Sequence, residues 1–352
     1  MTHDELLALV EMEEQPNGLF SVGFADPDLV NCTGHDFRKG PLKNVMFLSK
    51  FGSHLHGTTT PTSDLDLKAV FMADLSDIVL GRDRETVTAS SGGDGRNEAD
   101  DLDIEFIELR KLLSDAMKGQ TYAVELLHAD QGSEIFSTDL YEDLRANKDK
   151  LLTSNVKPFI GYCVSQAKKY GMKGSRLKAT EEALDFLKES NRNHRVEDVV
   201  DEIPKNDIVF VVDKDLAAQD EPVQLLEING KQFDMRVKLK DVTPVLENLI
   251  GKYGNRAHRA KDGVDWKAVG HAYRVIYELE ELLTTGAIQF PLKDREFLRE
   301  VKLGNVEYER VQEELPELIE RVDGLDTDLP KKPNRQFWDD WALSAYQKYV
   351  SF

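Results

Sequence analysis

Apolar and polar residues alternate along three segments in the first third of the chain. These segments are NVMFLSKFGSH at residues 44–54, SDLDLKAVFMADL at 63–75 and DLDIEFIEL at 101–109. A period of two is typical of a β-strand with one polar and one apolar face. The pattern therefore predicts three strands, with a loop that runs from Gly52 to Ser63 between the first two.

The spacing of apolar residues changes to three or four after these strands. LRKLLSDAMKGQTYAVELLHAD at 109–130 predicts two short helices, separated near Lys118 and Gly119. Beyond about residue 150 helical spacing dominates, as in DWKAVGHAYRVIYELEELLTTG at 265–286. The second half of the chain is therefore expected to be mainly helical.

Two features stand out from this helical half. Asn229-Gly230 separates two strand-like runs and favours a hairpin turn, because both residues tolerate a positive φ. We expect a small β insertion at about residues 201–239. Near the end of the chain, an aromatic helix is expected to dock on the body of the protein through Phe337, Trp338 and Trp341.

These elements together predict an α+β protein of two domains. Residues 1–150 would form a small mixed β-sheet with helices, and residues 151–352 would form a mainly helical domain that carries the β insertion. A length of 352 residues with 40% hydrophobic content is enough to bury one large core or two smaller ones.

Composition narrows the classes of function. The formal net charge is −20, which opposes broad adhesion to a nucleic-acid backbone but is compatible with a nucleotide held through a divalent metal. Cys32 and Cys163 are far apart and lack the spacing of a zinc or redox motif. The acidic start MTHDELLALVEMEEQ does not resemble a secretory signal, and no run is long enough to cross a membrane. We expect a cytoplasmic protein without a membrane partner.

The stretch GSHLHGTTTPTSDLDLKAV at residues 52–70 carries the main candidate chemistry. Asp64 and Asp66 are two apart on a predicted strand, so both carboxylates point to one side, and their repulsion is usually compensated by a divalent cation. Oxygen ligands alone suit Mg2+ or Mn2+. Gly52 lets the backbone approach a phosphate, and Ser53 adds a hydroxyl and an N–H donor. The combination predicts a metal–nucleotide site.

A third carboxylate is needed to complete a two-metal site and to receive a proton from an attacking hydroxyl. The strand DLDIEF offers Asp101, Asp103 and Glu105 on one face. The spacing alone leaves the choice among them open.

With Gly-Ser, ten intervening residues, Asp-x-Asp and a later acidic strand, the chain resembles the nucleotidyltransferase superfamily related to DNA polymerase beta. More narrowly, FGSHLHGTTTPTSDLDLKAVF is similar to predicted nucleotidyltransferases of bacteria and their phages. DIEFIELRKLLSDAMKGQTYAVELLHA and HAYRVIYELEELLTTGAIQFPLKDREFLREVKLGNV extend the similarity along the chain. The resemblance covers most of the chain apart from the β insertion and both termini.

The resemblance implies that Asp64, Asp66 and Asp103 are the catalytic and metal-binding carboxylates, with Glu105 as the alternative to Asp103. Asp103 is preferred because it precedes ELRK at the distance typical of the family. Gly52 and Ser53 would hold the triphosphate of a nucleoside triphosphate. The acceptor hydroxyl, on an RNA end, a protein or a small molecule, would attack the α-phosphorus and pyrophosphate would leave.

Several basic residues are further candidates for phosphate contacts. Lys68 would either neutralise Asp66 or reach a substrate phosphate. Lys173 and Arg176 belong to a basic cluster at 168–178 that is either a solvated helix end or a contact for phosphate or a short RNA end.

Histidines and an arginine complete the candidates. His271 and Arg274 share a polar helix stripe with Lys267 and Glu278, which is either an ordinary amphipathic face with intrahelical pairing or part of the substrate cleft. His54-Leu55-His56 lacks a third nitrogen or sulfur ligand nearby, so loop placement or phosphate bonding is favoured over zinc.

Two classes of function remain open on the sequence. The first is an active, metal-dependent nucleotidyltransferase. The alternative is a catalytically silent nucleotide-binding or protein-interaction module, such as a regulator or an antitoxin-like partner. Retention of the carboxylates and the Gly-Ser pair favours activity, because a binding module has no evident need for metal ligands plus a base. A third possibility, a polymerase or terminal transferase bound to nucleic acid, is disfavoured by the net charge and the small number of basic clusters.

Overall fold

The computed structural model describes residues 5, 7–61, 63–92, 101–129, 132–155, 159, 161, 173–206, 208–214, 223–257 and 264–350. The chain divides into two compact units. The first comprises Met1–Val164, Gly270–Val301 and Glu313–Phe352, and the second comprises Ser165–Val269 and Lys302–Gln312. This division differs from the boundary expected at residue 150, because two later segments return to the first unit.

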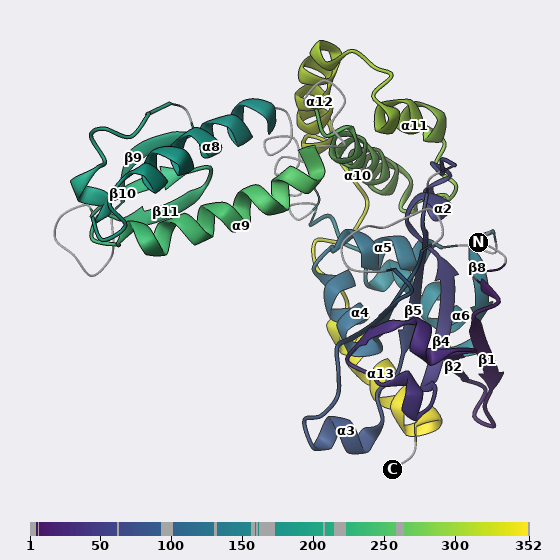
Figure 1. Ribbon diagram of the computed structural model, residues 1–352. Helices are drawn as coiled ribbons and strands as arrows, with labels where there is room; N and C mark the ends of the chain where they lie inside the picture. Colours follow the sequence, from purple (N-terminus) through teal and green to yellow (C-terminus); the bar gives the residue numbers. More distant parts are fainter. Residues whose placement is uncertain are drawn as a thin grey trace. The chain divides into compact units, whose positions relative to one another are not determined.

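An eight-stranded mixed sheet forms the centre of the first unit (Figure 1). Its strands are β1 (Val10–Glu14), β2 (Phe20–Phe24), β3 (Asn31–Thr33), β4 (Leu42–Lys50), β5 (Leu65–Phe71), β6 (Thr86–Ser90), β7 (Leu102–Glu108) and β8 (Glu134–Ser137). The order across the sheet is β1-β2-β4-β5-β7-β6-β3, with β8 also paired to β4. The β5–β7 pair is parallel, and the other pairs are antiparallel.

The three strands expected from alternation correspond to β4, β5 and β7. In β5 the apolar residues Leu65, Leu67 and Ala69 are buried, while Asp66 and Lys68 alternate with them on the more open face. The other strands have three to five residues each. Such short strands give too few positions for a period of two to be recognised. The fold class is α+β, as expected.

Several helices in the first unit pack against the sheet. The helices of this unit include α2 (Gly52–His56), α3 (Leu75–Val79), α4 (Leu109–Met117), α5 (Thr121–His128), α6 (Asp139–Ala146) and α13 (Arg335–Tyr349). Of these, α2 and α4 pack on β5, α4 also packs on β7, and α6 packs on β4. Three more, α10 (Trp266–Thr285), α11 (Arg295–Leu303) and α12 (Tyr308–Asp323), have residues in both units. The expected break between α4 and α5 is confirmed at Gly119, which has φ of 69°. No helix in these described ranges is long and apolar enough to span a membrane.

The second unit packs α8 (Lys173–Glu189) and α9 (Leu239–Ala257) with a three-stranded sheet of β9 (Val209–Lys214), β10 (Val223–Ile228) and β11 (Lys231–Asp234). Asn229 and Gly230 connect β10 to β11, both with positive φ, which confirms the expected hairpin. Leu226 and Ile228 of this sheet are fully buried against the helices. The small β insertion in the helical half is therefore present.

The C-terminal helix α13 docks on the first unit, as its aromatic residues predicted. Trp338 is only 1% exposed, and Trp341 Nε1 donates to Asp143 Oδ2 at 2.7 Å. The Tyr346 hydroxyl donates to Glu108, a buried carboxylate whose other oxygen accepts from the backbone N–H of Arg110 at the start of α4. Burial and the neighbouring Glu108 charge raise the pKa of Tyr346, so its hydroxyl keeps the proton that it donates.

We expect Tyr346→Phe to lower the free energy of unfolding by about 1.5 to 3 kcal/mol, the usual cost of losing a hydrogen bond to a charged group. Glu108 would then be left buried with one fewer donor. Urea unfolding followed by circular dichroism measures the change. Tyr349→Phe is the matched control, because its hydroxyl contacts the exposed Lys348, and we expect a change within about 0.5 kcal/mol. Equal effects of the two substitutions would contradict this account of α13.

Candidate functional site

Three carboxylates meet where β5 and β7 run side by side. Asp64 precedes β5, Asp66 lies within it, and Asp103 lies in β7. The parallel register pairs Asp66 with Asp103, while the flanking residues Leu65 and Leu102 are buried. One oxygen from each of the three aspartates lies within 4.8 Å of the others, and all three residues are half-buried. Strand pairing thus gathers residues from two separate parts of the sequence at one point.

The donor set of this acidic cluster, defined as Asp64, Asp66 and Asp103, fits a hard divalent cation. Carboxylate oxygens are the ligands that Mg2+ and Mn2+ prefer, and half-buried positions leave access for a substrate phosphate. The three carboxylates predicted to bind a metal are therefore brought together, and the identity of the metal stays a prediction.

Glu105, the alternative third carboxylate, has a different neighbour. It is paired in register with Lys68 of β5, and the Lys68 ammonium donates a hydrogen bond to its carboxylate. Lys68 Nζ also lies 5.0 Å from the ring centroid of Phe51 and 5.3 Å from that of Tyr122. The two ring contacts hold the ammonium beside the acidic cluster, two residues along the paired strands from Asp66 and Asp103.

The Gly-Ser pair packs directly against the acidic cluster. Gly52 has φ of +56°, and a Cβ at this position would lie 2.3 Å from Asp66 Oδ2. The adjacent Phe51 N–H donates to the Asp66 carbonyl oxygen at 2.8 Å. Only glycine fits both the backbone conformation and the space, so this position is adapted to a close approach.

The region expected to be a loop from Gly52 to Ser63 begins instead with the short helix α2. It ends at Gly57, which has φ of 75° in the left-handed region. A single helical turn between two glycines with positive φ has too few residues for a helical period, which is why the pattern suggested a loop. Within the described chain, the buried Ser53 Oγ has no hydrogen-bond partner. A hydroxyl in that state is suited to a ligand.

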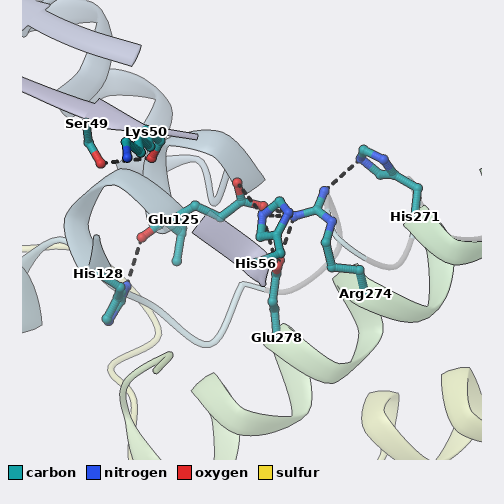
Figure 2. A network of polar contacts seen from close by, with 9 residues as sticks. Ser49, Lys50, His56, Glu125, His128, His271, Arg274 and Glu278 are labelled. Carbon is teal, nitrogen blue, oxygen red and sulfur yellow. Dashed lines mark hydrogen bonds and ion pairs between the residues drawn. The ribbon is translucent and has the colours of Figure 1, made fainter. Parts of the chain in front are cut away.

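A second, buried cluster lies at the other end of α2 (Figure 2). It contains His56 from α2, Glu125 from α5, and Arg274 and Glu278 from α10. Arg274 Nη1 donates to His56 Nε2 and to Glu278 Oε1, both at 2.9 Å, and also to Glu125 Oε1. Arg274 Nη2 donates to His271 Nε2 at 2.7 Å.

Charges within this buried cluster perturb one another. Burial favours the neutral form of Glu125, but the Arg274 charge outweighs it and holds the pKa of Glu125 below its ordinary value. Burial, with the Glu125 carboxylate adding to it, raises the pKa of Glu278 well above its ordinary value. Burial lowers the pKa of Arg274, but the charges of the two glutamates outweigh this effect. The pKa of Arg274 is raised overall, and the guanidinium stays charged. Arg274 thus pairs with two carboxylates, of which Glu125 is the more readily ionised.

The remaining residues predicted to contact phosphate are basic residues of the second half of the chain. Arg274 is buried, and its guanidinium is engaged by Glu125, Glu278 and both histidines, so it is not presented to a nucleotide in this structure. His271 is half-buried and hydrogen-bonded to Arg274. Lys173 and Arg176 belong to α8 in the second unit, and their side chains lie outside the described part of the chain, as do Lys168 and Lys169.

Sequence reasoning did not identify Glu125 as part of any site. It stands in TYAVELLH, where it is the one acidic residue of α5. A carboxylate flanked by apolar residues on both sides could have indicated a buried partner for a cation. That cation is Arg274, which lies 149 positions away in the sequence, so no local pattern could have identified it.

Comparison with known proteins places these features in a family. A family model described as the RNA repair pathway DNA polymerase beta family, RlaP, matches residues 30–185, which include both α2 and the acidic cluster. An uncharacterized 38.9 kDa protein from the nrdC-mobD intergenic region of Enterobacteria phage T4 is 31% identical over 322 residues, covering 85% of this chain and 96% of that protein. No solved structure matches. The chain thus belongs to the RlaP family of polymerase beta-like nucleotidyltransferases.

Proposed function

We propose that this protein transfers a nucleoside monophosphate from a nucleoside triphosphate to a hydroxyl at an RNA end and releases pyrophosphate. The observation that carries the proposal is the contact of the Gly52 turn with Asp66, inside a cluster of three carboxylates. Phosphate-binding backbone and metal-binding oxygens are then adjacent, as a metal-bound triphosphate requires. The family description supports RNA as the class of acceptor.

In the proposed reaction, Asp64, Asp66 and Asp103 hold Mg2+ or Mn2+. When bound, the metal supplies positive charge against the phosphate oxygens and favours ionisation of the acceptor hydroxyl. The acceptor oxygen forms a bond to the α-phosphorus, its proton passes to the Asp103 carboxylate, and the bond from the α-phosphorus to the bridging oxygen breaks. Pyrophosphate carries away the electron pair of the broken bond.

The Gly-Ser turn and Lys68 would bind and orient the donor. Ser53 Oγ has no partner in the described chain and is available to donate to a phosphate oxygen. Lys68, held by Glu105 and two aromatic rings, would add positive charge next to the carboxylates. With a net charge of −20, the chain is suited to a few phosphate contacts at an RNA end rather than a long track.

We expect label from an α-labelled nucleoside triphosphate to enter the RNA fraction of a bacterial lysate when Mg2+ or Mn2+ is present. Each of the four nucleotides is tested, and products are separated into RNA, protein and small molecules. The Asp64→Ala, Asp66→Ala double variant, checked for folding, should transfer none. Label in protein alone would overturn the RNA acceptor. No label in any fraction, with nucleotide still bound, would support the silent binding module instead.

The assignment of the third carboxylate is tested by a matched pair of substitutions. Asp103→Asn should lower kcat by about 100- to 10,000-fold, the usual contribution of a general base. Glu105→Gln breaks only the partly exposed pair with Lys68, worth up to about 1 kcal/mol, so we expect a loss of at most about fivefold. Steady-state kinetics on the labelled acceptor measures both. The reverse order of effects would assign the role to Glu105.

Gly52→Ala tests the contact between the turn and the acidic cluster. Its added methyl group would meet Asp66 Oδ2, so the turn must shift, and we expect kcat/KM for the triphosphate to fall by about 100-fold. Gly81→Ala is the control, because Gly81 also has a positive φ but its Cβ would meet no atom within 4 Å. The control should lose about 1 to 2 kcal/mol of stability with unchanged kcat/KM. Similar kinetics for the two variants would refute the close packing.

A further inference from the structure

We propose that Arg274 and Glu125 are positioning residues that fix the triphosphate-binding turn through His56. This inference rests on the proposed function and assigns a task to the buried cluster at the end of α2. It means that helix α10, outside the part of the chain matched by the family model, completes the nucleotide site.

The argument begins with the length of α2. Gly52 and Ser53 are its first two residues and His56 is its last. At about 1.5 Å of rise per residue, the two ends are separated by roughly 6 Å. A helix of one turn has no interior joint that could absorb a displacement. A shift of His56 is therefore transmitted to Gly52, which is already in tight contact with Asp66.

The far end of α2 is held by the segment Gly270–Val301. The His56 carbonyl oxygen accepts from Leu292 N–H at 3.2 Å. A Cβ on Gly57 would lie 2.8 Å from Pro291 Cβ and 2.9 Å from Arg295 Cδ, so the backbone approaches these residues closely. A further contact joins the Arg274 guanidinium to the His56 ring, and it is the one in which a charged group donates a hydrogen bond to α2.

Arg274 occupies the centre of its cluster. His56, Glu125 and Glu278 are grouped closely enough to hold a metal ion, with His56 Nε2 3.5 Å from Glu125 Oε2 and 3.7 Å from Glu278 Oε1. The guanidinium, however, donates to all three, and so takes the place that a cation would have. Arginine has no acceptor atom, so in this bond His56 accepts through the lone pair of Nε2. The cluster therefore has a structural role, in which the Arg274 guanidinium serves as the cation.

The two glutamates differ in what they contribute. Glu125 comes from α5, and the Arg274 charge holds its pKa below the ordinary value. Glu278 lies four residues from Arg274 on α10, and burial raises its pKa, so it is the weaker counterion. Loss of the Glu125 charge would leave the buried guanidinium with Glu278 alone, whose ionised form burial disfavours, and the side chain would move towards water. Glu278→Gln keeps Glu125 as the counterion of Arg274 and keeps an oxygen that can accept from the guanidinium, so it should change less. This asymmetry gives the proposal a matched pair of substitutions.

The test compares Glu125→Gln with Glu278→Gln in the full-length protein. Three quantities are measured for each: the unfolding midpoint, the affinity for Mn2+ alone, and KM and kcat for the nucleoside triphosphate. We expect Glu125→Gln to raise KM by about 10- to 100-fold, with Mn2+ affinity within about twofold of the unsubstituted protein, because the metal ligands lie on β5 and β7. Glu278→Gln should raise KM by less than about fivefold. A loss that came only from instability would lower Mn2+ affinity as well.

A second pair protects the test against poor folding. Glu125→Leu with Arg274→Met removes both charges, a replacement that often preserves or increases stability. It also removes the bond to His56, so KM should still rise by about tenfold or more. Arg274→Lys, made alone, keeps the positive charge. Its KM should therefore lie between that of the unsubstituted protein and that of the double variant.

The outcomes separate the two proposals. An unchanged KM in folded Glu125→Gln would overturn the positioning role. If Glu125→Gln does not fold, an unchanged KM in the double variant would overturn it. In either case, transfer by the unsubstituted protein would still support the proposed function. If the unsubstituted protein neither binds nucleoside triphosphate nor transfers label, both proposals are refuted.

Discussion

The parallel pairing of β5 with β7 is the constraint on which the rest of the site depends. It places Asp66 beside Asp103 and brings Asp64 close to both, with oxygens within 4.8 Å. Two unit charges at that distance repel by about 3 kcal/mol even at an effective dielectric constant of about 20. The strands resist this repulsion because their opposite faces are buried in the core, including Leu65, Leu67 and Ile104. Core packing thus sustains an arrangement that the charges alone would disfavour.

Two later segments secure the elements next to this pair. Tyr346 of α13 binds Glu108, which ends β7 and caps α4, so the strand that carries Asp103 is anchored at its far end. Arg274 of α10 binds His56 at the end of α2, whose first residues touch Asp66. One helix therefore acts on the strand and the other on the turn. The family match at residues 30–185 includes the carboxylates but neither of these supports.

Sequence reasoning succeeded where a short-range rule decided the outcome. A spacing of two predicted that the carboxylates of Asp64 and Asp66 would lie together, and they do, although Asp64 stands just before β5 rather than in it. The hairpin at Asn229-Gly230 followed from the conformational freedom of those residues. The resemblance, rather than spacing, favoured Asp103 over Glu105, and the structure groups Asp103 with the other two aspartates. The strands of three to five residues and the single turn of α2 lie below the length at which a period becomes visible.

Arg274 shows why the remainder depends on three-dimensional contacts. Its pairing with Glu278, four residues away on one helix, is a local relation that the amphipathic pattern anticipated. Its contact with His56 spans 218 positions, and its contact with Glu125 spans 149. A polar stripe does not distinguish an arginine facing a substrate from one facing a buried carboxylate, because both require the same residue types. Only the fold shows that this guanidinium points inward, and that position turns a candidate phosphate ligand into a candidate support for the turn beside it.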